Sequence, residues 1–525
     1  MTRRTTAGLV AAIGTALVST LTGAGAPTAH AQPTAAAVAA PAYVAPPIEW
    51  TRCADSYLRQ QGARCGMLIV PLDHSDPEGP TVKLAVSRIR HTTATASGVM
   101  FTNPGGPGGS GRWMATLGAS VPHGVGGSFD WYGMDPRGVG DSLPRLTCDR
   151  GYFDWDRPAY VPSSATIMRQ WRARTEAYAA ACGRAGARRL LPHLRTVDTV
   201  ADFETLREAI GAETVGFYGG SYGTYIAQVY ATLHPASLDR VVMDGVIDPT
   251  RVFYRANLDQ DRAFQGDMDA FFGWLGQHPR QFHLGSSKAA VKAAYRQLQD
   301  RLADHPVDRV GPSELTDALL PAGYGVRNWP FVGQQLSRLV VDNDPAGIRY
   351  LYRSGNPASQ DTGYAVYLAT ECTDAPWPSA WSTWREDNDR VHRKAPYLTW
   401  ANAWYNAPCR TWPAPAGPRV AVNGNGLGFA VLLINETLDA ATPISGALEV
   451  RRRFPTASLV EGVGGRSHAA GLSGVACVDN AIARYLRSGT VPTRRTGNRS
   501  DLECGPVPVP APRSPVRPRL SPWQL

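Results

Sequence analysis

The chain has 525 residues, of which 43% are hydrophobic and 18% charged, and its formal net charge is +9. This balance excludes a chain that is disordered or embedded in a membrane along most of its length. The positive excess is small for the size, and no basic run interleaved with aromatic residues is present, so we expect no nucleic-acid partner. A chain this long can bury a large core in two or three domain-sized units.

The first 31 residues have the pattern of a secretory signal peptide. Arg3 and Arg4 precede an apolar run from Ala7 to Leu21, and Ala29-His30-Ala31 suits a cleavage site. The apolar run is too short and too interrupted for a stable membrane span, so we expect no span in the mature chain. We therefore expect a secreted, extracellular protein, with residues 32–47 as a linker or pro-segment.

Between residues 48 and 250, strand and helix patterns alternate along the chain. Strands are expected at 67–70, 82–86, 99–101, 128–132, 214–218 and 240–243, and a helix at 199–210 with a second directly after residue 221. This alternation is typical of an α/β protein with a mostly parallel sheet and helices on both faces.

The pattern of residues along the chain changes at about residue 251. Helical patterns at 259–275, 287–302 and 332–341 predict a mainly helical cap inserted over 251–415. Strand patterns return at 419–422, 430–434 and 458–460, so we expect 416–505 to complete the sheet domain. Residues 506–525 are rich in Pro and Arg and predict an extended tail.

Eight cysteines agree with export, because disulfides persist in oxidising compartments. Eight cysteines allow about 105 pairings, among which the sequence alone does not choose. We expect sequential pairing, since each pair then closes a short loop: Cys53 with Cys65, Cys148 with Cys182, Cys372 with Cys409, and Cys477 with Cys504. A structural metal site is the alternative, but no two cysteines have C-x₂₋₄-C spacing, and we expect no metal.

The strongest chemical signal is the G-x-S-x-G spacing of Gly219, Ser221 and Gly223. It lies between a predicted strand and a predicted helix, which is the context that a nucleophile elbow requires. Flanking glycines allow the sharp turn, and the amide of Tyr222 would point at the oxyanion that forms during acyl transfer. The sequence therefore predicts Ser221 as a nucleophile.

A glycine-rich loop from Asn103 to Gly109 follows an earlier strand. By itself such a cluster is most often an ordinary turn, but its place upstream of the elbow favours a second source of oxyanion-binding amides. No cofactor is expected, because Gly424 to Gly428 lacks the spacing of a phosphate-binding loop.

The acid and the base of a triad should follow the serine in the order Ser, Asp, His. Asp439 follows the strand expected at 430–434, and His468 stands in a glycine-containing loop after the strand expected at 458–460. His468 would act as the general base, and Asp439 would hold its tautomer and orientation. Glu436 is the rival acid.

At these residues the chain resembles the secreted tripeptidyl aminopeptidases of actinomycetes, which are relatives of the prolyl aminopeptidases. The resemblance rests on Asn103 to Gly111, Asp135 to Ser142, Phe217 to Thr224, Val242 to Pro249, Glu371 to Asp374, Leu438 to Pro443, and Cys477 to Cys504. It implies an α/β-hydrolase fold, the triad Ser221, Asp439 and His468, and an oxyanion hole at Gly105, Gly106 and Tyr222. It also implies release of tripeptides from free N-termini, with proline before the cut in some relatives.

One departure lies beside the base, where Arg466-Ser467 and Ala469-Ala470 flank His468 in place of the Gly-His-Thr frequent in relatives. An exopeptidase must also recognise an α-ammonium group, for which a carboxylate in the cap is the natural partner. Glu371 and Asp374 are the candidates. A packing or surface role near the expected Cys372–Cys409 bridge is at least as good an interpretation of both.

Three alternatives remain. A prolyl aminopeptidase would release single residues, and a secreted esterase or lipase would use the same triad. The insert is rich in Trp, Tyr and charged residues, whereas a lipase lid should be broadly apolar. An inactive binding protein on the same scaffold would have a broken triad, and here every part is present. We expect a monomer with peptide or protein N-termini as its substrate.

Overall fold

The computed structural model describes residues 43–356 and 361–512. The predicted signal peptide, most of the predicted linker and residues 513–525 of the predicted tail lie outside the described residues. Among the helices that are described, none is both long and apolar enough to cross a bilayer.

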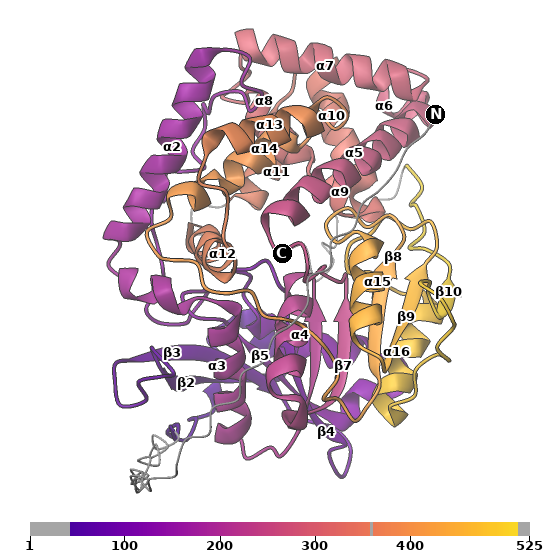
Figure 1. The fold of residues 1–525 in the computed structure, drawn as a ribbon. Helices are drawn as coiled ribbons and strands as arrows, with labels where there is room; N and C mark the ends of the chain where they lie inside the picture. Colours follow the sequence, from indigo (N-terminus) through magenta and orange to yellow (C-terminus); the bar gives the residue numbers. More distant parts are fainter. Residues whose placement is uncertain (1–42, 357–360, 513–525) are drawn as a thin grey trace, which may run out of the picture. The chain divides into compact units, whose positions relative to one another are not determined.

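One sheet organises the chain, and ten strands belong to it within the described residues (Figure 1). Its order is β1-β2-β3-β5-β4-β6-β7-β8-β9-β10. Pairing is antiparallel from β1 to β5 and parallel from β5 through β4 to β10. The strands are β1 Thr51–Arg52, β2 Arg64–Pro71, β3 Thr81–Ile89, β4 Gly98–Asn103, β5 Phe129–Met134, β6 Val215–Gly220, β7 Leu238–Asp244, β8 Val431–Glu436, β9 Ala457–Gly462 and β10 Leu502–Cys504. The mostly parallel sheet confirms the predicted fold class.

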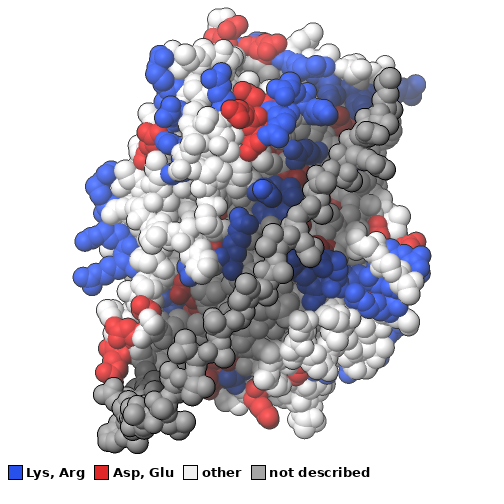
Figure 2. Space-filling model, viewed as in Figure 1, with Lys and Arg blue, Asp and Glu red and all other residues white. Residues whose placement is uncertain are grey.

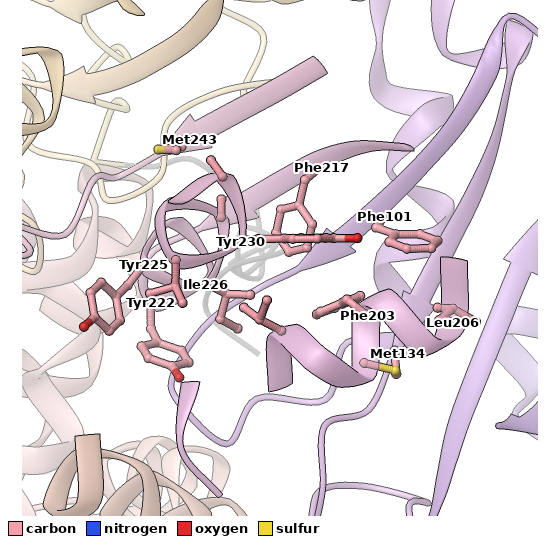
Figure 3. Close-up of a cluster of buried hydrophobic side chains, with 14 of the residues drawn as sticks. Phe101, Met134, Phe203, Leu206, Phe217, Tyr222, Tyr225, Ile226, Tyr230 and Met243 are labelled. Atoms are coloured by element: carbon pink, nitrogen blue, oxygen red, sulfur yellow. The ribbon is translucent and has the colours of Figure 1, made fainter. Parts of the chain in front are cut away.

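Helices cover both faces of the parallel strands, and successive side chains of a strand point to opposite faces. On one face, Phe217 of β6 lies 5.1 Å from the ring of Phe203 and 6.0 Å from that of Tyr230 (Figure 3). Its neighbour Tyr218 packs with the opposite cluster, which includes Tyr485. The first face carries α3 Thr196–Ala209, α4 Tyr222–Leu233 and α15 Ile444–Arg453, and the second carries α16 Ala476–Ser488.

The segment between β7 and β8 is mainly helical, as predicted, and forms a cap (Figure 1). Its helices are α5 Tyr254–Gln277, α6 Pro279–Phe282, α7 Lys288–Asp304, α8 Pro312–Leu319, α9 Pro321–Tyr324, α10 Trp329–Val341, α11 Ala346–Gly355, α12 Asp361–Asp374, α13 Trp381–His392 and α14 Thr399–Asn406. The cap has its own apolar core, built around residues such as Phe271, Leu315 and Leu336.

One helix that precedes the nucleophile also packs with the cap. Helix α2, Ala165–Arg184, lies beside the cap helices in Figure 1. The ring of Trp171 stacks at 5.8 Å on that of Trp404 in α14. The sequence pattern placed this region in the sheet domain, because nothing local to α2 indicates which surface its aromatic face covers.

The prediction of a strand at 419–422 was wrong, because this segment has no regular secondary structure. Val422 donates its N–H to Val420 O within the segment itself, at 3.0 Å, and β8 already occupies the edge of β7. The other expected strands are present within a few residues of their predicted bounds.

The predicted tail also begins with an ordered part. Val507 is 3% exposed, and its N–H donates to Glu436 Oε1 at 2.6 Å. The chain therefore stays attached to the sheet domain for at least three residues beyond β10.

Four disulfides link the eight cysteines, and the pairing is the sequential one: Cys53–Cys65, Cys148–Cys182, Cys372–Cys409 and Cys477–Cys504. The last of these ties α16 to β10. Disulfides of this number are typical of proteins that fold in an oxidising compartment.

Candidate active site

Ser221 occupies the single-residue turn between β6 and α4. Its backbone lies at φ 53° and ψ −127°, a strained region for a residue with a β-carbon. A Cβ at Gly219 would stand 2.2 Å from Gly223 O, and one at Gly223 would stand 2.3 Å from Asn103 O. The turn therefore needs both glycines, which explains the spacing seen in the sequence.

Asp439 and His468 meet at the carboxyl ends of β8 and β9. His468 Nδ1 lies 2.9 Å from Asp439 Oδ2 and 3.0 Å from Oδ1. The amides of Ala441 and Thr442 each donate to Asp439 Oδ1 at 3.0 Å, and Thr442 Oγ1 donates to Oδ2 at 2.8 Å. The carboxylate is thus fixed by its own loop and presents one edge to the imidazole.

Burial by itself lowers the pKa of His468, but the neighbouring Asp439 charge outweighs it and raises that pKa above its ordinary value. An imidazole held in this way keeps Nδ1 protonated and leaves Nε2 free to accept a proton.

The turn at Ser221 and the histidine loop converge on the end of β7. Ser221 N donates to Asp244 O at 2.9 Å, and the next residue, Gly245, packs against the imidazole. A Cβ at Gly245 would stand 3.0 Å from His468 Cε1. Ser221 and His468 therefore both lie near the end of β7, and within the predicted triad hydrogen bonds join His468 to Asp439.

The glycine loop after β4 lies against the elbow. Gly105 has φ +93°, and a Cβ there would stand 2.6 Å from Tyr222 N. The Gly105 amide itself donates to Asn103 Oδ1 at 2.8 Å, so the expectation that it binds an oxyanion was wrong. The N–H groups of Gly106 and Tyr222 have no acceptor among the described residues, and they are available to an oxyanion.

Comparison with known proteins identifies the family. The chain is 37% identical over 495 residues to the tripeptidyl aminopeptidase of Streptomyces lividans, which covers 91% of this chain and 90% of that protein. The chain belongs to the tripeptidyl aminopeptidase family. A family model described as TAP-like protein matches residues 395–504, which include Asp439 and His468.

More distant relatives share nearly the whole length. Serine protease Hip1 of Mycobacterium tuberculosis is 29% identical over 85% of this chain and 90% of its own. Carboxylesterase B of the same organism is 28% identical over 88% of this chain and 91% of its own. Among solved structures, proline iminopeptidase of Mycobacterium smegmatis is 13% identical, covers 81% of this chain and 98% of its own, and has a TM-score of 0.40. Membership of the tripeptidyl aminopeptidase family makes this chain a serine hydrolase, and the TAP-like family model together with the mostly parallel sheet gives it the α/β-hydrolase fold.

Glu371 and Asp374, the two candidates for binding the substrate's α-ammonium group, have different surroundings. Asp374 Oδ1 accepts from Thr196 N at 2.8 Å, and its Oδ2 accepts from Thr196 Oγ1, so both oxygens are engaged at the start of α3. Glu371 is 5% exposed, and its Oε2 has no hydrogen-bond partner among the described residues. Burial raises the pKa of Glu371 to about 8. Of these two candidates, Glu371 alone has a carboxylate oxygen without a hydrogen-bond partner, and Tyr367 and Asn257 are near neighbours of its side chain.

Glu436, the rival acid, is turned away from the imidazole. Its two oxygens accept from Ser467 N and Val507 N, while the His468 ring faces Asp439.

Sequence reasoning gave Asp244 no role, although it lies in one of the motifs that carry the family resemblance. The signal was its place at the end of a strand adjacent to the one that leads to Ser221.

On the face of the molecule shown in Figure 2, acidic side chains lie among the basic ones rather than leaving one continuous basic stripe. A groove of about 330 Å³ on the cap is lined by four arginines. Three of them form ion pairs: Arg390 with Asp387, and both Arg251 and Arg262 with Asp259. No cluster of three or more His, Cys, Asp or Glu side chains suited to a metal occurs in residues 43–356 and 361–512.

Proposed function

We propose that this protein is a secreted serine exopeptidase that releases tripeptides from free N-termini. The observation that carries the proposal is the His468–Asp439 pair beside the strained turn at Ser221, in a chain 37% identical to a tripeptidyl aminopeptidase. The four disulfides support export.

Catalysis begins when His468 Nε2 takes the proton of Ser221 Oγ as that oxygen attacks the scissile carbonyl. The carbonyl oxygen becomes an oxyanion, and the amides of Gly106 and Tyr222 bind it; one such donor is worth about 3 kcal/mol. His468 then gives the proton to the leaving amine, and the tripeptide remains esterified to Ser221. Water, deprotonated by the same imidazole, hydrolyses this ester and regenerates the enzyme.

Glu371 would bind the α-ammonium group of the substrate. It belongs to α12, whose first part lies over the glycine loop: a Cβ at Gly108 would stand 2.2 Å from Gly363 O. The Glu371 charge also contributes to the raised pKa of Tyr222, the residue after the nucleophile, which indicates that the two are near each other. An ammonium group would supply the missing partner of Oε2 and favour the ionised carboxylate.

Mass spectrometry of the products from one unblocked peptide and its N-acetylated twin tests the proposal. We expect an N-terminal tripeptide from the unblocked peptide alone, and none from a Ser221→Ala variant with an unchanged melting temperature. A peptide with proline before the cut, compared with alanine at that position, tests the preference for proline that the family resemblance implies. Equal cleavage of both twins would exclude an exopeptidase that reads the free amine.

An esterase is the second candidate, and the 28% identity to a protein named Carboxylesterase B favours it. The same Ser221 and His468 would then hydrolyse an ester. Turnover of p-nitrophenyl esters with no cleavage of either peptide would support this candidate over the first.

A further inference from the structure

The loop that carries His468 is attached to the protein on both sides of the imidazole by carboxylates that lie outside the predicted triad. On the N-terminal side, Ser467 N donates to Glu436 Oε2. On the C-terminal side, Gly471 N donates to Asp244 Oδ2 at 3.0 Å. The backbone of His468 itself makes a different contact, since its N–H donates to Tyr324 O of the cap at 2.9 Å.

Asp244 connects this loop to the nucleophile. Its main-chain oxygen accepts from Ser221 N at 2.9 Å, while its side chain accepts from Gly471 N and from Tyr218 Oη at 3.1 Å. Tyr218 belongs to β6, the strand that leads into Ser221. One residue with no exposed surface thus contacts the turn before the nucleophile and the loop after the base.

Glu436 connects the other side of the loop to the C-terminal segment. Its Oε1 accepts from Val507 N at 2.6 Å, and its Oε2 accepts from Ser467 N. Gly465 packs on this carboxyl, because a Cβ there would stand 2.2 Å from Glu436 Cδ. Both oxygens of Glu436 are therefore engaged by backbone donors, whereas Asp244 uses only Oδ2 and its Oδ1 has no partner in the described part of the chain.

We propose that Asp244 and Glu436 are positioning residues that hold the His468 loop in register with Ser221 through hydrogen bonds to the amides of Gly471 and Ser467. The proposal rests on the proposed role of His468 as the base, and it applies to peptide and ester substrates alike. Asp244 needs no charge for this role, since one acceptor oxygen suffices, whereas Glu436 must accept with both of its oxygens. Burial raises the pKa of each to about 7, although the hydrogen bonds that the two carboxyls accept act in the opposite direction.

Asp244 and Glu436 differ in how many carboxylate oxygens accept hydrogen bonds, and this difference makes the test specific. Asp244→Asn keeps one acceptor oxygen, which is all that Gly471 requires, whereas Asp244→Ala removes it. Glu436→Gln keeps one acceptor for two donors, so either Ser467 or Val507 loses its partner. Asp479→Ala is the matched control, because Asp479 is also buried and accepts from the amide of Gly474 in the same loop at 2.8 Å, beyond the catalytic segment.

We expect Asp244→Ala and Glu436→Gln to lower kcat by about 10- to 100-fold, the loss typical of a displacement near 1 Å. KM should stay unchanged, and Asp244→Asn and Asp479→Ala should keep the wild-type kcat. Rates are measured on a tripeptide p-nitroanilide and on a p-nitrophenyl ester. The concentration of active sites, by which each rate is divided, is determined by titration with a fluorophosphonate carried to completion. The melting temperature of each variant shows whether it is folded.

A wild-type kcat in Asp244→Ala or in Glu436→Gln would overturn the proposal, as would an equal loss in Asp244→Asn and Asp244→Ala. If one variant does not fold, the other tests the same loop from its opposite side. Ser221→Ala separates a failure of the positioning role from a failure of the proposed function. If Ser221→Ala is inactive and the positioning variants keep the wild-type kcat, only the positioning role is refuted. If Ser221→Ala retains activity, the proposed function is refuted.

Discussion

Replacement of Asp439 by Asn tests the proposed triad most directly, because the surroundings of the carboxyl dictate how the amide must lie. Asp439 Oδ1 accepts from the amides of Ala441 and Thr442, both at 3.0 Å. These two donors require an oxygen, whereas the Thr442 hydroxyl that donates to Oδ2 can accept a hydrogen bond instead. The Asn oxygen therefore takes the Oδ1 position and its NH₂ group replaces Oδ2. That group then lies where Oδ2 stands 2.9 Å from His468 Nδ1.

The consequence is the wrong tautomer of the base. An Asn N–H that points at Nδ1 requires Nδ1 to be unprotonated, which leaves the proton on Nε2, facing Ser221. A protonated Nε2 cannot accept the proton of the nucleophile, and a change of this kind lowers kcat by about 10⁴-fold. That factor corresponds to about 5 kcal/mol of transition-state stabilisation. The fold should persist, since the two amide donors keep their acceptor.

The assay is kcat/KM on a tripeptide p-nitroanilide, with melting temperature as the measure of folding and Asp479→Asn as a buried carboxylate control. We expect the control to match the wild type. A value of kcat/KM in Asp439→Asn within about tenfold of the wild type would refute the tautomer argument. A much larger loss in Glu436→Gln than in Asp439→Asn would identify Glu436 as the acid instead.

Three further predictions concern the base, the substrate anchor and the oxyanion loop. Because the Asp439 charge raises the pKa of His468, activity should fall as the pH drops below neutrality, and Asp439→Asn should shift this limb to lower pH; a flat pH–rate profile would contradict the role of His468. Glu371→Gln should raise KM about 30-fold for an unblocked tripeptide anilide, from roughly 2 kcal/mol for a buried charged contact, and leave ester hydrolysis unchanged; equal effects on both substrates would argue against an amine anchor. Gly105→Ala should lower kcat about 100-fold, because its Cβ would stand 2.6 Å from Tyr222 N; a wild-type kcat would show that this close approach is not required.

Parts of the site that depend on neighbouring residues in the chain could be predicted from the sequence. The turn at Ser221 is built by Gly219 and Gly223, and its strand and helix lie directly before and after it. Asp439 and His468 each follow a strand, so their order along the chain and the carboxyl edge of a parallel sheet were enough to place them together.

Hydrogen-bond partners that the sequence pattern does not reveal, some of them distant and some local, decided the features that the sequence left open or predicted wrongly. Asp374 and Glu371 are three residues apart in α12, yet Asp374 is engaged by Thr196, 178 positions away, and Glu371 is not. The Gly105 amide was expected to bind an oxyanion, but the side chain of Asn103 takes it. The segment 419–422 has a strand-like composition, but β8 occupies the edge of β7 and the segment makes a hydrogen bond within itself instead.

The sequence by itself thus determined the class of fold, the nucleophile turn and the order of the candidate triad, because local backbone geometry and the period of apolar residues specify them. Tertiary structure alone decided which buried carboxylate oxygens accept hydrogen bonds, which have no partner among the described residues, and which surface α2 covers. These outcomes depend on the partners that burial brings to each polar group, and the partners of Asp244 and Glu436 come from up to 227 positions away.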